Sequence, residues 1–283
     1  MSLVNVSLLN PGQPSRNGGQ QLLQSRVSPV SHHNNIINNV FMNFHYENPD
    51  DVRGNGYETV QIRDGENEQG DGYNTVEGNY FYSLNSEAEI VSIKSRFNRI
   101  SGNAFEANEG SLTLRNGDYN TVTGNVWDGR GLSGSAGIRI FGRHHVLSHN
   151  WFMGLKAGAL SVGAGDEIHV AAENITLTDN TMQNCYEALR LGASYDQPPQ
   201  EPIVFINNVV SNEDGLKMIE QNPPECDYDF SQGNYFFGSN LGWSGALPGG
   251  LVWDTSDVDL GTEGAETLQG IKCKAGPSWE QSC

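Results

Sequence analysis

Three cationic residues end or lie within short apolar segments that follow one another along the chain. Lys94 ends EIVSIK, Arg115 ends SLTLR, and Arg139 lies in GIRI. A lysine that has lost its proton can act as a general base, and arginines bind and orient carboxylates. Such a row suits a negatively charged polymer from which one member of the row removes a proton. Arg63 in TVQIR and Arg190 in ALRLG extend the series.

Two glutamates precede Lys94 in the segment SEAEI, at Glu87 and Glu89. Residues two apart on a strand point to the same side, so both carboxylates would face the same way. Paired carboxylates with an amide oxygen make a suitable calcium site, because calcium takes several oxygen ligands. The alternative is a solvated strand face without a ligand. The closeness of the pair to the cations favours the metal site.

The elements that must position these residues are copies of one repeat, in which an asparagine follows a short apolar strand. The asparagines are Asn39, Asn79, Asn103, Asn125, Asn150, Asn180, Asn208 and Asn234. After the first interval they are 22 to 30 residues apart, the length of one turn of a parallel β-helix. Asparagine tolerates left-handed backbone at a bend, and stacked copies can form a hydrogen-bonded ladder. A β-sandwich does not require one motif eight times in phase, so we expect an all-β, right-handed parallel β-helix.

The same repeat predicts where the cations lie. Lys94, Arg115 and Arg139 follow their preceding asparagines by 15, 12 and 14 residues. Adjacent strands are about 4.8 Å apart, so the three would span about 10 Å, comparable to two sugar units. We expect the β-helix domain to cover residues 32–240. Residues 1–31 show no clear repeat and are interpreted as a remnant of earlier turns, and residues 241–283 as an irregular C-terminal cap.

The composition limits the partners. The net charge is −18 and the sequence pI is about 4.6, which argues against nucleic acid as a ligand. No apolar run is long enough to span a membrane, and the opening residues do not form a signal peptide. None of the four cysteines lies in a CxxC pair, so zinc is not expected. Cys273 and Cys283 could close a C-terminal loop, and free thiols are the alternative.

From Glu87 to Arg139 the sequence resembles polysaccharide lyase family six, the alginate lyase and chondroitinase B family. The resemblance lies in EAEIVSIKS, NRISGNAF, GSLTLRNG, NTVTGNVWDG and GIRIFGRHHVLSHNWF, with GNGYETVQI upstream. It extends from about His32 to the GPSW segment near the C-terminus. The resemblance implies a lyase that acts on an acidic polysaccharide and is secreted or periplasmic.

It also implies catalytic and metal-binding roles. Lys94 matches the Brønsted base of the family and Arg115 its proton donor. Glu87 and Glu89 match calcium ligands, and Asn55 in GNGYE matches a third.

Five residues would contact the substrate, according to the resemblance and to their position. Arg139 matches a substrate-binding arginine, and Glu58 belongs to the same group. Asn116 stands where family members usually carry histidine in LTLRHG, which would change substrate preference or weaken activity. Arg63 extends the cation series. His145 is a further candidate, and stacking between repeats is its alternative role.

The chemistry that follows is β-elimination. The proton beside a uronate carboxylate is weakly acidic, and calcium would neutralise that carboxylate while Lys94 removes the proton. Neighbouring positive charges favour the neutral lysine that this step needs. We expect a calcium-dependent lyase with alginate as substrate. Chondroitin or dermatan is the alternative substrate. A non-catalytic glycan-binding β-helix and an inactivated homologue are the alternative functions.

Overall fold

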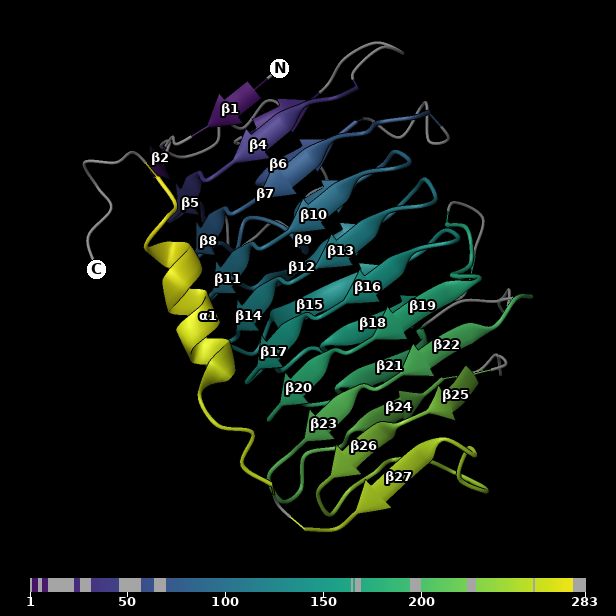
Figure 1. The fold of residues 1–283 in the computed structure, drawn as a ribbon. Helices are drawn as coiled ribbons and strands as arrows, with labels where there is room; N and C mark the ends of the chain where they lie inside the picture. Colours follow the sequence, from purple (N-terminus) through teal and green to yellow (C-terminus); the bar gives the residue numbers. More distant parts are fainter. Residues whose placement is uncertain are drawn as a thin grey trace, which may run out of the picture.

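The computed structural model describes residues 2–4, 7–9, 23–25, 32–45, 57–63, 70–163, 165, 169–193, 200–222, 228–256 and 258–276. These residues form a right-handed parallel β-helix, as predicted. Its strands build three parallel sheets, A, B and C, and successive turns of the chain add one strand to each (Figure 1). A single helix, α1 (Glu263–Lys272), lies beside them.

The strands are assigned to the sheets in their order of pairing. Sheet A contains β1 (Ser2–Val4), β4 (Asn35–Ile37), β7 (Thr75–Glu77), β10 (Arg99–Ser101), β13 (Thr121–Thr123), β16 (Val146–Ser148), β19 (Ile175–Thr178), β22 (Ile203–Ile206) and β25 (Tyr228–Gln232). Sheet B contains β2 (Ser7–Leu9), β5 (Val40–Met42), β8 (Tyr80–Tyr82), β11 (Ala104–Glu106), β14 (Val126–Asp128), β17 (Trp151–Met153), β20 (Thr181–Gln183), β23 (Val209–Ser211), β26 (Asn234–Phe237) and β27 (Leu251–Asp254). Sheet C contains β3 (Leu23–Ser25), β6 (Val60–Ile62), β9 (Glu89–Ile93), β12 (Gly110–Leu114), β15 (Ser135–Ile140), β18 (Leu160–Gly163), β21 (Leu189–Ala193) and β24 (Ile219–Gln221).

The repeated asparagines form the predicted ladder at the bend between sheets A and B. Each side-chain amide donates to the carbonyl oxygen of the next asparagine side chain, for example from Asn79 to Asn103 and from Asn103 to Asn125, both at 2.9 Å. The ladder continues at 2.9 to 3.0 Å from Asn39 to Asn234. The buried asparagine amides are therefore paired with one another and with backbone carbonyls, as buried polar groups require.

Aromatic side chains fill the interior behind this ladder. The rings of Phe41, Phe81, Phe105, Trp127 and Phe152 are stacked, with centroids 4.6 to 4.9 Å apart. All five are at most 3% exposed. The repeat thus builds the core as a column along the helix axis, which holds the three sheets at constant spacing.

The two ends of the chain add to this framework. Strands β1, β2 and β3 lie within the first 31 residues and pair with β4, β5 and β6, so this segment carries a turn of the β-helix. In the C-terminal segment, β27 extends sheet B, and α1 packs along the side of sheet B against Val40, Tyr80 and Val126. Among the described residues, no helix is long and apolar enough to span a membrane.

The cysteines within the described ranges are in different states. Cys185 is free and buried, and burial raises the pKa of its thiol to about 12. Cys273 is disulfide-bonded. Its partner lies outside the described residues, as do Cys226 and Cys283. The predicted link between Cys273 and Cys283 therefore stays a prediction.

Replacing Asn103 with alanine should destabilise the fold by about 3 kcal/mol. The side chain of Asn103 accepts from the backbone and side chain of Asn79 and donates to Asn125 and to the Val76 carbonyl. Its loss leaves several of these groups buried without partners. Denaturant unfolding of Asn103→Ala measures the effect, and the exposed Asn240→Ala serves as control. Equal stability of the two variants would contradict a structural role for the ladder.

Candidate active site

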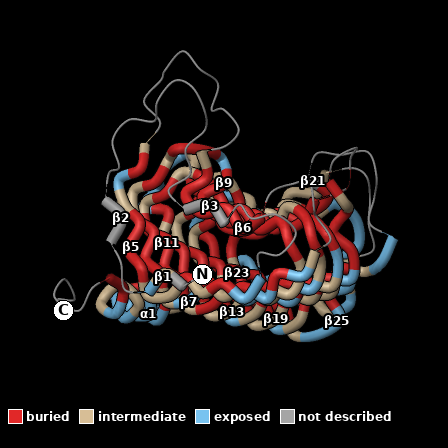
Figure 2. The backbone as a smooth tube through the Cα atoms, turned by 90° about the horizontal axis from the view of Figure 1, so that it is seen from above, coloured by how far each residue is buried: buried red, intermediate tan, exposed pale blue. Residues whose placement is uncertain are grey.

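Sheet C differs from sheet A in that the polar residues on its outer face are buried. Gln61, Ser92, Thr113 and Ser161 are at most 9% exposed. The first three are paired in register on β6, β9 and β12. On sheet A, by contrast, Arg99 is exposed. Figure 2 shows the same difference along the chain, with buried strands around β6 and β9 and exposed stretches near β25. The predicted catalytic residues lie on this covered face.

Lys94 and Arg115 occupy equivalent positions on adjacent turns. Each follows the last residue of its strand, and its backbone N–H donates to the preceding turn: Lys94 to Ile62, and Arg115 to Ile93, both at 3.0 Å. Because Leu114 pairs with Ile93, the next residues, Arg115 and Lys94, are neighbours. The structure therefore brings the predicted base and proton donor together.

Lys94 forms an ion pair with Glu58. Its Nζ lies 3.2 Å from Glu58 Oε1, and the two side chains are 8% and 1% exposed. Glu58 was predicted to contact the substrate; in the structure it contacts Lys94, the predicted base, and its contact with substrate stays a prediction. A buried charge requires a partner, and Glu58 supplies it to Lys94. This contact also gives the lysine a carboxylate that can accept its proton.

Glu89 holds the two arginines. Its Oε1 lies 3.0 Å from Arg115 Nη1 and 3.8 Å from Arg139 Nη1. The side chain of Glu89 is 3% exposed, whereas those of Arg115 and Arg139 are 23% and 33% exposed. A buried carboxylate thus anchors two guanidinium groups that reach solvent. The two guanidinium groups can therefore contact an anionic ligand that approaches from solvent.

The register of Arg139 differs from the expectation of one straight row. Arg139 pairs with Thr113, two residues before the position of Arg115. The position beyond β15 that corresponds to Arg115 is taken by Phe141, whose N–H bonds to the Leu114 carbonyl. The Arg139 guanidinium lies 5.3 Å from the Phe141 ring. The cations therefore form two columns on one face, with Lys94 and Arg115 in one and Arg139 in the other.

Glu87 is held by the segment that contains Tyr57. Its Oε2 accepts a hydrogen bond from the Tyr57 backbone N–H at 2.7 Å, and the Ser86 hydroxyl donates to the Tyr57 carbonyl at 2.7 Å. Gly110 allows the backbone of Glu87 to lie close to β12, because a Cβ at Gly110 would be 2.8 Å from the Glu87 carbonyl oxygen. Asn55, the third predicted metal ligand, lies outside the described residues.

Unsatisfied buried polar atoms are concentrated in the same region. The buried side-chain atoms without a hydrogen-bond partner among the described residues include Thr59 Oγ1, Arg63 Nε, Glu89 Oε2, Ser92 Oγ and Asn116 Oδ1. Proteins rarely leave such groups unpaired, so these atoms are candidates for contact with a ligand, an ion or water. Two of the five belong to β9, two flank β6, and Asn116 follows β12. The site is therefore suited to a polar ligand.

The residues present fit a hard cation in part. Glu89 Oε2 is buried and has no hydrogen-bond partner among the described residues, and Glu87 lies two residues away with a second buried carboxylate. Carboxylate oxygens are the ligands that calcium prefers. Within the described ranges, no three His, Cys, Asp or Glu side chains are grouped as a metal site. A complete coordination sphere would need oxygens from elsewhere, such as Asn55.

Three further predicted residues are buried. Arg63 is 5% exposed, and its Nη1 would lie 1.8 Å from a Cβ added to Gly70. Asn116 is 6% exposed. His145 is 1% exposed and belongs to a second ladder, where its Nδ1 accepts from the Asn120 N–H at 3.0 Å and its Nε2 lies 2.8 Å from the Phe141 carbonyl. Burial lowers the pKa of His145 to about 4, and its position favours the stacking role.

The sequence reasoning missed the small polar residues of the face. Ser92 and Thr113 pair on β9 and β12, and both are fully buried. The signal was present, because EIVSIK and SLTLR alternate apolar residues with a serine or threonine before the cation. Read with the period of two of a strand, this places Ser92 beside Lys94 and Thr113 beside Arg115.

The comparison with known proteins shows the family of the chain. The model of the chondroitinase B family matches residues 16–222. The chain therefore belongs to the chondroitinase B family, the polysaccharide lyase family six that its motifs resemble. No curated protein matches the chain.

Several solved structures share the fold. A mannuronic acid specific polysaccharide family 6 lyase from human gut microbiota has a TM-score of 0.79 and 23% identity, over 99% of this chain and 65% of that one. A family six alginate lyase in complex with a trisaccharide has a TM-score of 0.67 and 20% identity, over 83% and 57%. A mutant of the family six alginate lyase AlyGC has a TM-score of 0.73 and 25% identity, over 94% and 37%. The chain thus spans less than two thirds of the length of these proteins.

Proposed function

We propose that the protein is a carbon–oxygen lyase that cleaves a uronate-containing polysaccharide, with alginate as substrate, by β-elimination. The observation that carries the proposal is the arrangement of Lys94, Arg115 and Glu89 on the covered face of sheet C. A candidate base lies beside a guanidinium that is anchored at 3.0 Å by a buried carboxylate. The unpaired polar atoms around them fit a ligand that is rich in hydroxyl and carboxylate groups.

In the proposed reaction, Lys94 Nζ removes the proton from the sugar carbon that carries the carboxylate. The electron pair of that C–H bond forms a carbon–carbon double bond, and the bond to the glycosidic oxygen breaks. Arg115 stands next to Lys94 and delivers a proton to the departing oxygen, directly or through water. Glu58, 3.2 Å from Lys94, first takes the ammonium proton of the ion pair, which leaves Lys94 Nζ as the neutral amine that this step requires. The base and the acid are thus different groups on adjacent turns.

Calcium is the proposed cofactor, held by Glu87, Glu89 and Asn55, and it would neutralise the substrate carboxylate. The charges of the described site support a cation. Lys94, Arg115 and Arg139 are matched by Glu58, Glu87 and Glu89, so these six side chains carry no net charge. A divalent cation would make the site positive in a chain whose net charge is −18. It would therefore help to attract a polyanion.

Chondroitin or dermatan is the second candidate substrate. The matching family model is that of chondroitinase B, whereas the similar solved structures are described as alginate lyases or as mannuronic acid specific. A secreted or periplasmic location suits either polymer. The disulfide of Cys273 supports that location, because disulfides persist in oxidising compartments.

The proposed function is tested by ultraviolet absorbance, because β-elimination creates an unsaturated uronate that absorbs. The protein is incubated with poly-mannuronate, poly-guluronate, chondroitin sulfate and dermatan sulfate, each with added calcium. Absorbance should rise with alginate. A rise with the glycosaminoglycans alone would support the second candidate. No rise with any polymer, with binding retained, would favour a glycan-binding or inactivated protein.

Replacing Arg139 with alanine should raise KM by roughly tenfold, the equivalent of about 1.4 kcal/mol, and change kcat less. The Arg139 guanidinium is one-third exposed and sits in the column beside the catalytic pair. It would hold the substrate carboxylate equally in the ground state and the transition state. Steady-state kinetics measure the effect, with the exposed Arg130→Ala as control. A fall in kcat at constant KM would contradict a binding role.

A further inference from the structure

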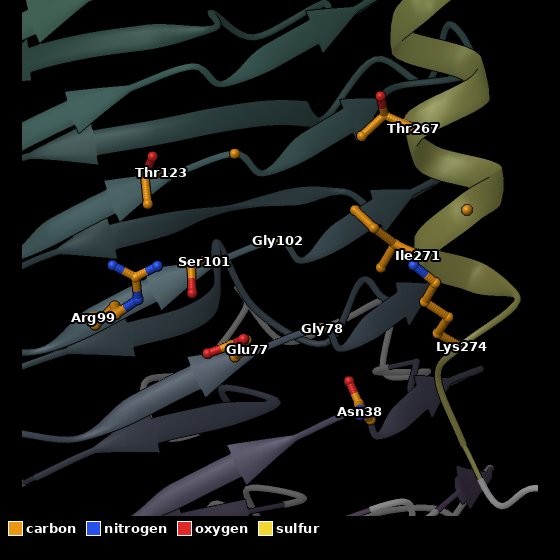
Figure 3. A pocket seen from close by; sticks show the side chains of 12 residues that line it. Asn38, Glu77, Gly78, Arg99, Ser101, Gly102, Thr123, Thr267, Ile271 and Lys274 are labelled. Atoms are coloured by element: carbon orange, nitrogen blue, oxygen red, sulfur yellow. The ribbon is translucent and has the colours of Figure 1, made fainter.

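A pocket of about 640 Å³ lies away from sheet C, between α1 and the turns that join sheets A and B (Figure 3). Its volume lies within the range of small-molecule sites. The sheet side is formed by turns that follow β7, β10 and β13, and the helix side by Thr267, Gly270, Ile271 and Lys274. Since the catalytic residues lie on the outer face of sheet C, the pocket is a separate site.

Glycines keep this pocket open on both sides. Gly102 and Gly124 follow β10 and β13 with left-handed φ angles of 60° and 63°, and a Cβ on either would meet nothing within 4 Å. Gly270 lies inside α1, and a Cβ there would also enter open space. Glycine inside a helix lowers helix stability relative to alanine. No group packs closely against Gly270, so close packing does not explain the lower helix stability. The missing side chain leaves the helix side of the pocket uncovered at this position.

The sheet side of the pocket presents polar groups. Ser101 is 5% exposed, and its Oγ is buried without a hydrogen-bond partner among the described residues. Ser101 pairs in register with Glu77 on one side and Thr123 on the other. Figure 3 shows Arg99 and Ser101 on β10 and Thr123 on the adjoining β13, opposite Thr267, Ile271 and Lys274 of the helix side. The Ser101 hydroxyl is therefore a polar group of this wall that no described residue satisfies.

The helix wall is held in place by hydrogen bonds and ion pairs to the buried Glu106. Glu106 Oε2 accepts from the Tyr80 hydroxyl at 2.6 Å and from Lys272 Nζ at 3.3 Å, and Glu106 Oε1 accepts from Arg130 Nη2 at 2.8 Å. Burial acts to raise the pKa of Glu106, but these hydrogen bonds and the charge of Lys272 outweigh it and lower the pKa. Leu268 and Ile271 add apolar contacts with sheet B. The pocket is therefore preformed.

We propose that this pocket is a second, non-catalytic binding site for a short acidic oligosaccharide. Arg99 binds a sugar carboxylate, and Ser101 hydrogen-bonds a sugar hydroxyl. Glu77 accepts further hydroxyls and at the same time disfavours a phosphate dianion. Ile271 packs on the apolar face of a sugar ring. The ligand class rests in part on the proposed function, because oligouronates are what that reaction releases.

The experiment uses the Lys94→Ala protein, which should leave the ligand uncleaved, and an alginate trisaccharide as probe. Isothermal titration should give two sites per chain, one on sheet C and one in the pocket. Arg99→Ala and Gly270→Leu, each added to Lys94→Ala, should leave one site. Leucine at position 270 projects into the pocket from a helical position. Ala265→Leu, an exposed change on the same helix, should keep both sites. Mannotriose, which has no carboxylate, should not fill the pocket.

The outcomes separate the pocket from the catalytic proposal. If Lys94→Ala binds at one site, and this site is retained after Arg99→Ala and Gly270→Leu, the proposal for the pocket is wrong. The proposed lyase function is then unaffected. One site that is lost in both variants, together with no product from any polymer, would support the pocket and contradict the lyase. Two sites that persist in both variants would place the second site elsewhere and overturn the inference.

Discussion

The Lys94→Ala variant should lose turnover by about 10²- to 10⁴-fold, the usual contribution of a general base, and should still bind oligosaccharide. A base acts on the transition state, whereas the arginines hold the substrate before and during the reaction. Lys94→Arg should be equally inactive, because a guanidinium keeps its proton at ordinary pH. Product formation and trisaccharide binding are measured on the same preparations.

Two controls keep this prediction specific. Loss of Lys94 leaves the buried Glu58 without the ammonium 3.2 Å away, so thermal unfolding must show that each variant is folded. If proton removal limits the rate, substrate deuterated beside the carboxylate should react more slowly with the wild type. Full activity in Lys94→Ala would exclude this base. His145 would not replace it, since its ring is buried and both nitrogens are engaged, so Glu58 would be tested next.

Much of the fold could be predicted because the same arrangement of residues recurs at the bend of successive turns. An asparagine at the bend has to satisfy the buried backbone of two turns, so its side chain is required in each copy, as the bonds of Asn103 to Asn79 and Asn125 show. The aromatic that follows has to fill the same space each time. Such requirements repeat in the sequence and can be read from it. The residues of the asparagine ladder and of the aromatic core column can be predicted because this pattern repeats.

The register of the cations could not be obtained by counting residues. Between β9 and β12 the register shifts at Leu112, and between β12 and β15 it shifts again between Gly110 and Leu112. Bulges of this kind insert residues without a sequence motif, and they are common next to active sites. Counting from the asparagines therefore placed Arg139 level with Arg115, although it pairs with Thr113.

The pairing of Lys94 with Glu58 could not be predicted from the sequence either. Glu58 lies 36 residues earlier, within the long interval between Asn39 and Asn79. Only the parallel pairing of β6 with β9 makes them neighbours. Similarly, the C-terminal segment includes α1, which lies on sheet B because Leu268 and Lys272 have contacts there. Contacts between distant segments depend on the three-dimensional path, which no local pattern encodes.

Replacing Glu89 with alanine should abolish both calcium binding and turnover. One oxygen of Glu89 anchors Arg115 and Arg139, and the other is buried without a partner among the described residues. The substitution removes a metal ligand and leaves both guanidinium groups without their shared carboxylate. Calorimetry with calcium, after chelation, should show binding to the wild type and none to Glu89→Ala. The exposed Glu213→Ala is the control and should bind normally.

Glu89→Gln separates the two roles of this side chain. Glutamine keeps an oxygen that can accept from Arg115 and Arg139, but it lacks the charge that a calcium site requires. If the metal is essential, Glu89→Gln should be as inactive as Glu89→Ala and should also fail to bind calcium. If the wild type binds no calcium and its activity survives a chelator, the metal role is wrong. In that case Glu89→Gln should retain more turnover than Glu89→Ala, because orienting the two arginines would be the remaining task of Glu89.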